Sequence, residues 1–294
     1  MFVFVISNGR SGSTLVHELL ARHHDVGFVS NLEDRIPGLP ASAGRYNNEL
    51  YRRVPVRLTR KGRLRYAPSE AWRALSREVS PMLASSVRDL VAADAMPWLA
   101  ERLRRFFIDR ASAQRKPVFL HKFTGWPRTG MLSAVFPDAR FIHVVRDGRA
   151  VAASDLRTPW WRGYEGPERL GCGPLPAAYA AEWEASGRSF PLLAGVSWKI
   201  AMDAYATARE KVAADQWLDM RFEDLVADPA SRFEELLSFM GLAPDPSYRA
   251  ALAATVFQTD RRNAFQRQLS PGDIALLEVS LADHLRAWGY GGDR

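Results

Sequence analysis

A short glycine-rich stretch near the N-terminus carries residue types that bind an oxyanion. Residues 2–20 read FVFVISNGRSGSTLVHELL, an apolar run, then small polar residues, then aliphatic residues at helical spacing. A glycine turn between a strand and a helix exposes unpaired N–H groups and the positive end of the helix dipole, and glycine lets an anion approach the backbone. Arg10 adds a fixed cation, and Ser11, Ser13 and Thr14 add hydroxyl donors. The stretch predicts a phosphate-type loop.

This loop differs from the one that binds ATP. The ATP-binding loop has two glycines flanking four residues, then a lysine and a Ser or Thr that holds magnesium. Here Gly9 and Gly12 are three positions apart, with Arg10 between them and no lysine following. Taken alone, the motif is also compatible with an ordinary strand-to-helix turn that carries a surface arginine.

Other polar residues follow short apolar runs later in the chain. Lys122 ends the run that starts at Val118, and Arg146 follows the run Arg140–Val145, with Ser154 eight residues further along an expected helix. Arg146 and Ser154 can therefore converge on one phosphate. Glu33 follows the run Val26–Val29, where either a catalytic carboxylate or a plain surface carboxylate can lie.

These runs define the expected fold. We expect strands at residues 2–6, 26–29, 118–122, 140–145 and 217–220, separated by helical patterns. Alternating strands and helices predict an α/β fold, a three-layer parallel sheet with helices on both faces, related to P-loop NTPases. Residues 41–114 are expected to be a helical insertion, with a helical pattern over Ser69–Arg110, within one domain over residues 1–294. Trp160–Gly187, rich in Trp, Gly and Pro, is expected to be a mobile aromatic binding loop.

Composition limits the possible partners. The chain has 294 residues, one cysteine, 47% hydrophobic and 25% charged residues, a net charge of +7 and a pI of about 9.8. Such a balance indicates a globular protein with an anionic partner, which can be nucleic acid, an anionic cofactor or an acidic acceptor. No stretch approaches the ~20 apolar residues that span a bilayer. We expect a soluble, cytoplasmic protein with no disulfide and no membrane span.

Three separated segments resemble the sulfotransferases that use 3′-phosphoadenosine 5′-phosphosulfate. SNGRSGSTL at Ser7–Leu15 is similar to their 5′-phosphosulfate loop, and RFIHVVRDGRAVAAS at Arg140–Ser154 to their 3′-phosphate segment. MRFEDLVADP at Met220–Pro229 resembles the stretch that follows their last core strand. The order and spacing of the three segments also agree with this family.

The resemblance implies a role for each matching residue. Arg10 would contact the sulfuryl group, and Lys122 would face the bridging oxygen. The remaining positions would bind the donor nucleotide or its product, adenosine 3′,5′-bisphosphate: Gly9, Ser11, Gly12, Ser13 and Thr14 at the 5′ end, and Arg146 and Ser154 at the 3′-phosphate. Arg261 and Arg262 resemble a loop that closes over the 3′-phosphate. No metal is expected, because fixed cations can stabilise a sulfuryl group.

The resemblance also suggests a base for the acceptor hydroxyl. Small-molecule members of the family place a histidine where this chain has Thr124, whereas members that act on glycans or tyrosine use a glutamate after the second strand. Glu33 is therefore the expected base and His121 the alternative. The acceptor stays open among glycans, small molecules and peptides. A kinase or other NTPase of related fold and a nucleic-acid-binding protein are the competing hypotheses; nucleic acid is not the expected partner.

Overall fold

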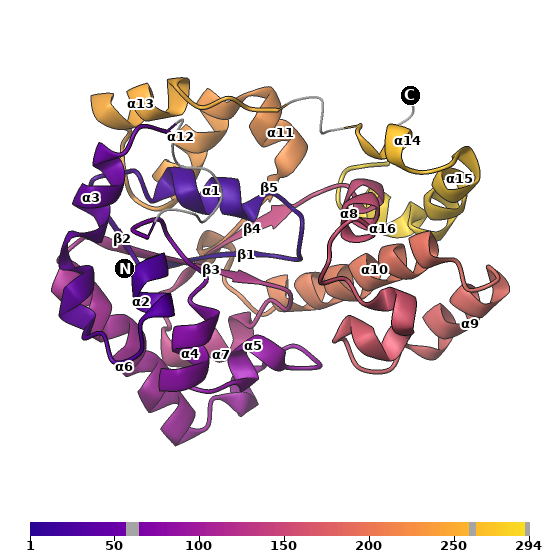
Figure 1. Cartoon of the computed structure of the whole chain (residues 1–294), viewed down its shortest axis with the longest axis horizontal. Coiled ribbons are helices and arrows are strands. Elements are labelled where there is room, and N and C mark those ends of the chain that lie inside the picture. Colours follow the sequence, from indigo (N-terminus) through magenta and orange to yellow (C-terminus); the bar gives the residue numbers. More distant parts are fainter. Residues whose placement is uncertain (57–64, 259–262, 292–294) are drawn as a thin grey trace.

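Five parallel strands form the central sheet of the described residues, in the order β2-β3-β1-β4-β5 (Figure 1). The computed structural model describes residues 1–56, 65–258 and 263–291. The strands are β1 (Phe2–Ser7), β2 (Val26–Phe28), β3 (Val118–Thr124), β4 (Arg140–Val145) and β5 (Trp217–Arg221). β1 lies between β3 and β4, so the ends of three strands that are distant in sequence become neighbours. The expected α/β parallel-sheet fold is confirmed.

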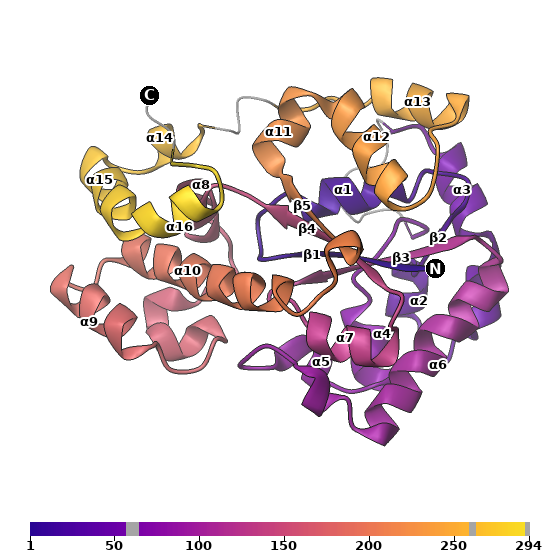
Figure 2. The same cartoon turned by 180° about the vertical axis from the view of Figure 1, so that it is seen from behind.

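Helices cover both faces of the sheet because successive strand side chains point to opposite sides. In β1, Phe4 and Ile6 join one buried cluster, while Val3 and Val5 join a second one on the other face. The second face carries α1 (Ser13–Leu20), α11 (Phe222–Ala227), α12 (Pro229–Phe239) and α13 (Pro246–Ala253), which lie together above the sheet in both views (Figures 1 and 2). A strand covered on both faces is apolar throughout, as the sequence of β1 is.

The first face carries most of the other helices, including the longest ones. They include α6 (Pro97–Gln114), α7 (Thr129–Val135), α8 (Gly148–Asp155), α10 (Phe190–Arg209), α15 (Pro271–Ser280) and α16 (Ala282–Ala287). Smaller elements are α2 (Asn31–Arg35), α3 (Asn47–Arg53), α9 (Ala177–Ala185) and α14 (Phe265–Gln268). Among the described helices, none combines the length and apolar character that crossing a bilayer requires.

The helical pattern expected over Ser69–Arg110 is broken into separate helices. They are α4 (Trp72–Glu78), α5 (Met82–Ser85) and the start of α6, with a 3₁₀ turn at Ala92–Asp94. Pro81 precedes α5 and Pro97 is the first residue of α6. Proline has no N–H to donate to the preceding turn, so it begins a helix and does not continue one.

The tryptophan-rich segment is more regular than expected. Trp160–Gly187 contains 3₁₀ turns at Gly163–Glu165 and Pro167–Leu170 and the helix α9. The sequence of α9, AAYAAEWEA, is rich in strong helix formers and follows Pro176, which suits the start of a helix. The expectation of a loop throughout this segment is therefore wrong, although its first residues do line a pocket.

Candidate active site

The glycine-rich loop joins the end of β1 to the start of α1 and is held in shape by its own hydroxyl groups. Ser7 Oγ donates to Ser13 Oγ at 2.7 Å, and the Ser11 hydroxyl donates to the side-chain oxygen of Asn8. These two bonds turn the hydroxyls of Ser11 and Ser13 inward, whereas Thr14 is exposed. The first N–H groups of α1 have no partner within the helix, so the backbone is the main donor to an anion here.

Gly12 is required at the start of α1 for two physical reasons. Its φ is +86°, a left-handed conformation that residues with a side chain rarely adopt. A Cβ at this position would also lie 2.2 Å from the Phe222 ring, which therefore sits directly on the loop backbone. Phe222 begins α11, so the third sequence segment packs against the first.

Arg10 connects the loop to the segment after β4. Its Nε donates to Ser154 Oγ at 2.8 Å, and its carbonyl oxygen accepts a hydrogen bond from Arg146 Nη1 at 3.1 Å. Three residues expected to hold opposite ends of one nucleotide thus lie in direct contact. Arg261 and Arg262, expected to close over the 3′-phosphate, lie outside the described residues.

The third segment supports Arg146 and the turn that follows β4. The Arg146 guanidinium lies 5.0 Å from the centre of the Phe222 ring, a cation–π distance. The adjacent Glu223 accepts hydrogen bonds from the Asp147 N–H at 3.3 Å and from the Tyr290 hydroxyl at 2.8 Å. Burial raises the pKa of Glu223. All three segments named from the sequence therefore meet at one edge of the sheet.

Lys122 reaches the loop from β3, as expected. Its buried Nζ donates to Thr14 Oγ1 at 2.7 Å and pairs with Glu70 Oε1 at 2.6 Å. Glu70 Oε2 also accepts hydrogen bonds from Thr124 Oγ1 and Trp72 Nε1, both at 2.6 Å. Burial alone would raise the pKa of Glu70, but Lys122 and these donors together hold it below its ordinary value. Sequence reasoning missed Glu70, which lies in a stretch without a motif.

Glu33 does not reach the loop. It forms a capping box with Ser30 at the start of α2, in which its carboxylate accepts from the Ser30 N–H at 2.8 Å and hydroxyl at 2.9 Å. The same carboxylate accepts from Asn47 Nδ2 at 2.5 Å and pairs with Arg110 Nε at 3.3 Å. Glu33 is 2% exposed. These contacts give it a structural role, so the geometry does not favour Glu33 as the base.

The alternative base, His121, is enclosed on the opposite face of β3 from Lys122. Its ring lies between those of Phe107 and Phe123, with centroids 5.0 and 4.7 Å away. Burial lowers the pKa of His121 to about 3, so its neutral form is favoured and its basicity is low. The structure gives His121 a place in the aromatic core.

A pocket of about 630 Å³ opens beside the loop. Asn8 and Gly9 line it on the loop side, and Thr124, a partner of Glu70, lines it from the end of β3. Five of the nine tryptophans line the rest: Trp72, Trp126, Trp160, Trp161 and Trp198. The pocket lies next to the residues that surround Arg10 and Lys122 and has room for a second substrate.

Asp155, the last residue of α8, lies in the wall of this pocket next to Ser154. It is 8% exposed, and its Oδ1 has no hydrogen-bond partner within the described part of the chain. Burial raises the pKa of Asp155 to about 7, and the nearby Arg10 cation offsets only part of that effect. Apart from its position next to Ser154, nothing in the sequence pointed to this residue.

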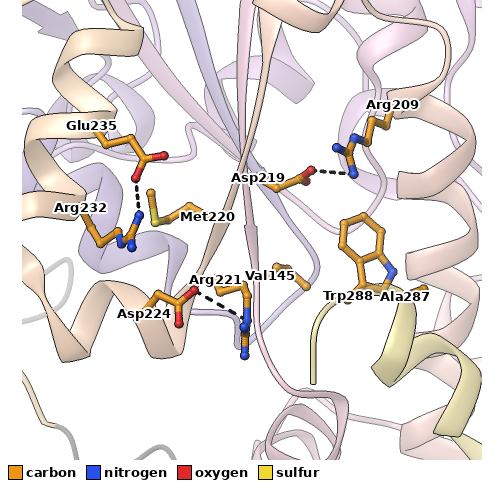
Figure 3. A pocket seen from close by; sticks show the side chains of 10 residues that line it. All are labelled: Val145, Arg209, Asp219, Met220, Arg221, Asp224, Arg232, Glu235, Ala287 and Trp288. Atoms are coloured by element: carbon orange, nitrogen blue, oxygen red, sulfur yellow. Dashed lines mark hydrogen bonds and ion pairs between the residues drawn. The ribbon is translucent and has the colours of Figure 1, made fainter. Parts of the chain in front are cut away.

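A second, smaller pocket of about 210 Å³ lies beside the edge strand β5 (Figure 3). Its arginines are paired with carboxylates: Arg209 with Asp219 at 3.0 Å, and Arg232 with Glu235 at 2.8 Å. Because these charges neutralise one another, this pocket is a weaker anion site than the loop at β1.

The family model of the sulfotransferases matches residues 3–246. The chain belongs to the sulfotransferase family. The matched residues include the glycine-rich loop and the segment after β4. They also include Met220–Pro229 and the helix α12 that follows. Family membership therefore rests on the same part of the chain that builds the site.

The individual relatives found for this chain are distant. Omega-hydroxy-beta-dihydromenaquinone-9 sulfotransferases Stf3 of Mycobacterium bovis and Mycobacterium tuberculosis are 25% identical over 183 residues, 60% of this chain and 42% of theirs. The match thus spans less than half the length of these relatives.

Solved structures agree in fold. Sulfotransferase STF9 from Mycobacterium avium superposes with a TM-score of 0.59 at 16% identity, over 97% of this chain and 76% of that one. The sulfotransferase domain from the curacin biosynthetic pathway gives 0.53 at 14% identity, over 95% and 96% of the two chains.

Substituting Gly12 by Ala is expected to lower the stability of the protein by more than backbone strain alone would. The added Cβ meets the Phe222 ring in addition to requiring a positive φ, so the loss of stability should exceed the ~1 kcal/mol expected from φ alone. Thermal unfolding of Gly12→Ala and of the control Gly38→Ala measures the difference. Gly38 has φ +73° with open space around its Cβ position. Equal losses in the two variants would contradict the packing argument.

Asp155→Asn is expected to stabilise the protein increasingly as the pH rises. The folded protein holds a proton on Asp155 up to about pH 7, whereas the unfolded chain releases it near pH 3.8. The wild type therefore loses stability between these values, by up to about 2 kcal/mol from pH 5 to pH 7, and the amide does not. Melting curves at pH 5 and pH 8 test this, with the exposed Asp138→Asn as control. If the difference in melting temperature between variant and wild type does not grow from pH 5 to pH 8, Asp155 is already ionised in the folded protein at pH 5 and the expectation is wrong.

Proposed function

We propose that this chain transfers a sulfuryl group from 3′-phosphoadenosine 5′-phosphosulfate to an acceptor hydroxyl. The observation that carries the proposal is the contact of Arg10 with both Arg146 and Ser154. A nucleotide with anionic groups at its 5′ and 3′ positions needs two anion-binding segments within its own length. The loop at β1 and the segment after β4 meet this requirement.

The chemistry of the side chains fits such a donor. The backbone of Gly9–Thr14 at the start of α1 offers N–H donors for the 5′-phosphate, and Arg10 offers a cation for the sulfuryl oxygens. Arg146 and Ser154 offer a charged and a neutral donor for the 3′-phosphate. We expect that Arg10 and Lys122 supply the positive charge, so that no metal ion is required.

Lys122 stabilises the departing phosphate oxygen in this proposal. Its Nζ contacts Thr14 in the first turn of α1, where the 5′-phosphate is expected. During transfer, the acceptor oxygen forms a bond to sulfur while the bond between sulfur and the 5′-phosphate oxygen breaks. The negative charge that develops on that oxygen is stabilised by the ammonium group, in the manner of phosphoryl transfer.

We propose Glu70, in place of Glu33, as the base that takes the proton of the acceptor hydroxyl. Glu70 pairs with Lys122, and its other two partners, Thr124 and Trp72, both line the large pocket. The carboxylate thus lies between the donor residues and the space for an acceptor. Its lowered pKa keeps it ionised near neutral pH, as a proton acceptor must be.

Arg146→Ala is expected to weaken binding of adenosine 3′,5′-bisphosphate by about 10- to 100-fold, the loss typical of one charge-assisted contact. Isothermal titration calorimetry measures the affinity. Arg104→Ala, an exposed arginine of α6, is the matched control and should bind as the wild type does. Wild-type affinity in Arg146→Ala would remove the 3′-phosphate site from the proposal.

Glu70→Gln is expected to lower kcat by about 10²–10⁴-fold, because general-base catalysis typically accelerates a reaction by that factor. The affinity for the bisphosphate should change little. Glu33→Gln should instead lower the melting temperature, because it removes one of the two carboxylates that pair with the buried Arg110, the other being Glu78. Turnover with phosphosulfate donor and thermal melts of both variants distinguish the two roles. A large fall in kcat for Glu33→Gln with Glu70→Gln near normal would restore Glu33 as the base.

A further inference from the structure

The large pocket combines aromatic walls with a buried carboxyl group. Five tryptophans line it, of which Trp161 and Trp198 are buried and Trp160 is 59% exposed at its edge. Among its lining residues, Arg128, Asp155, Arg162, Arg169 and Cys172 carry ionisable side chains. Flat indole faces next to hydrogen-bonding groups suit a ligand with both apolar faces and polar edges.

The three arginines of the pocket already have partners. Arg128 donates to the carbonyl oxygens of Leu83, Thr124 and Trp126, and Arg162 and Arg169 pair with Glu165 at 2.5 and 3.1 Å. Asp155 differs from them, because its buried Oδ1 has no hydrogen-bond partner within the described residues. Among the described residues that line this pocket, Asp155 Oδ1 and Ser86 Oγ are the buried side-chain oxygens without a hydrogen-bond partner, and Asp155 is the carboxyl group of the two.

A buried polar group without a partner is unfavourable, and a ligand that supplies the partner gains the corresponding free energy. A hydroxyl group suits Asp155 in either protonation state, because a hydroxyl can both donate and accept. Asp155 follows Ser154, which contacts Arg10, so a ligand at Asp155 lies close to the donor residues.

We propose that the pocket binds a compact polyhydroxylated ring of the glycoside class, with Asp155 accepting a hydrogen bond from a ring hydroxyl other than the one that receives the sulfuryl group. The indole faces of the wall stack on the apolar faces of the ring. This inference rests on the proposed function, since it names the acceptor of that reaction.

The same features disfavour a lipid alcohol. A long apolar chain in this pocket would leave the Asp155 carboxyl desolvated and without a partner. A site built to pair with a hydroxyl discriminates strongly against ligands that lack it. The Stf3 relatives are named for a hydroxylated menaquinone, and a comparable acceptor here would place an apolar chain against Asp155.

Binding of defined probes to the complex with adenosine 3′,5′-bisphosphate tests the inference without requiring turnover. The probes are the 4-nitrophenyl β-D-glycosides of glucose, galactose and xylose, and farnesol as the lipid alcohol. Quenching of tryptophan fluorescence reports occupancy, because tryptophans form the wall. We expect at least one glycoside to bind, about tenfold or more weakly to Asp155→Leu and with nearly wild-type affinity to Asp155→Asn, whose amide oxygen still accepts a hydrogen bond.

The outcomes separate this inference from the proposed function. Binding of the bisphosphate by the wild type is measured first, and its absence would overturn the proposed function. If the bisphosphate binds but no glycoside does, or if farnesol is preferred, only the glycoside inference is overturned. Glycoside affinity in Asp155→Leu within threefold of the wild type also overturns it. Thermal melts of both Asp155 variants exclude unfolding as the cause of any loss.

Discussion

The parallel pairing of β1 with β4 is the constraint on which the site depends. Val3 lies opposite Arg140 and Ile6 opposite His143, so both strands end at the same edge of the sheet. The backbone of each strand then turns into a helix there, one through Gly12 and the other through Asp147. Only because of this register can the Arg10 carbonyl reach Arg146 and the Arg10 side chain reach Ser154. This register thereby brings two segments more than a hundred residues apart into direct contact.

The pairing of β1 with β3 decides which side chain of β3 meets the loop. Val5 lies opposite Lys122, and alternate residues of a strand face opposite sides of the sheet. Lys122 therefore faces α1 and Thr14, while His121 enters the aromatic cluster with Phe107. A slip of one residue would exchange them, burying a lysine among phenylalanines and removing a cation from the loop. The cost of burying that charge without a partner enforces the register that the site needs.

Local sequence signals were sufficient for the parts of this fold that local physics determines. Apolar runs located the five strands, and the change from a strand pattern to a helical one located the loop around Gly12. The contacts that define the acceptor side are not local. Glu70 pairs with Lys122, which lies 52 positions later in the chain. Glu33 follows the second strand as a loop carboxylate would, but its carboxylate accepts a hydrogen bond from Asn47 and pairs with Arg110. Neither contact follows from spacing, because both arise from how the helices between β2 and β3 pack.

The two sides of the site follow opposite electrostatic rules. On the side proposed to bind the donor, Arg10, Lys122 and Arg146 bring positive charge together, as binding of an anionic nucleotide would require. An ionised carboxylate close to Arg10 would weaken that field. Glu70 is ionised and offsets the charge of Lys122 by pairing with it, whereas burial raises the pKa of Asp155 to about 7 and so favours a protonated, neutral carboxyl beside Arg10. Burial of Asp155 thus provides a hydrogen-bonding group on the acceptor side without placing a full negative charge beside the donor. The same desolvation that destabilises the ionised group preserves the positive field at the loop.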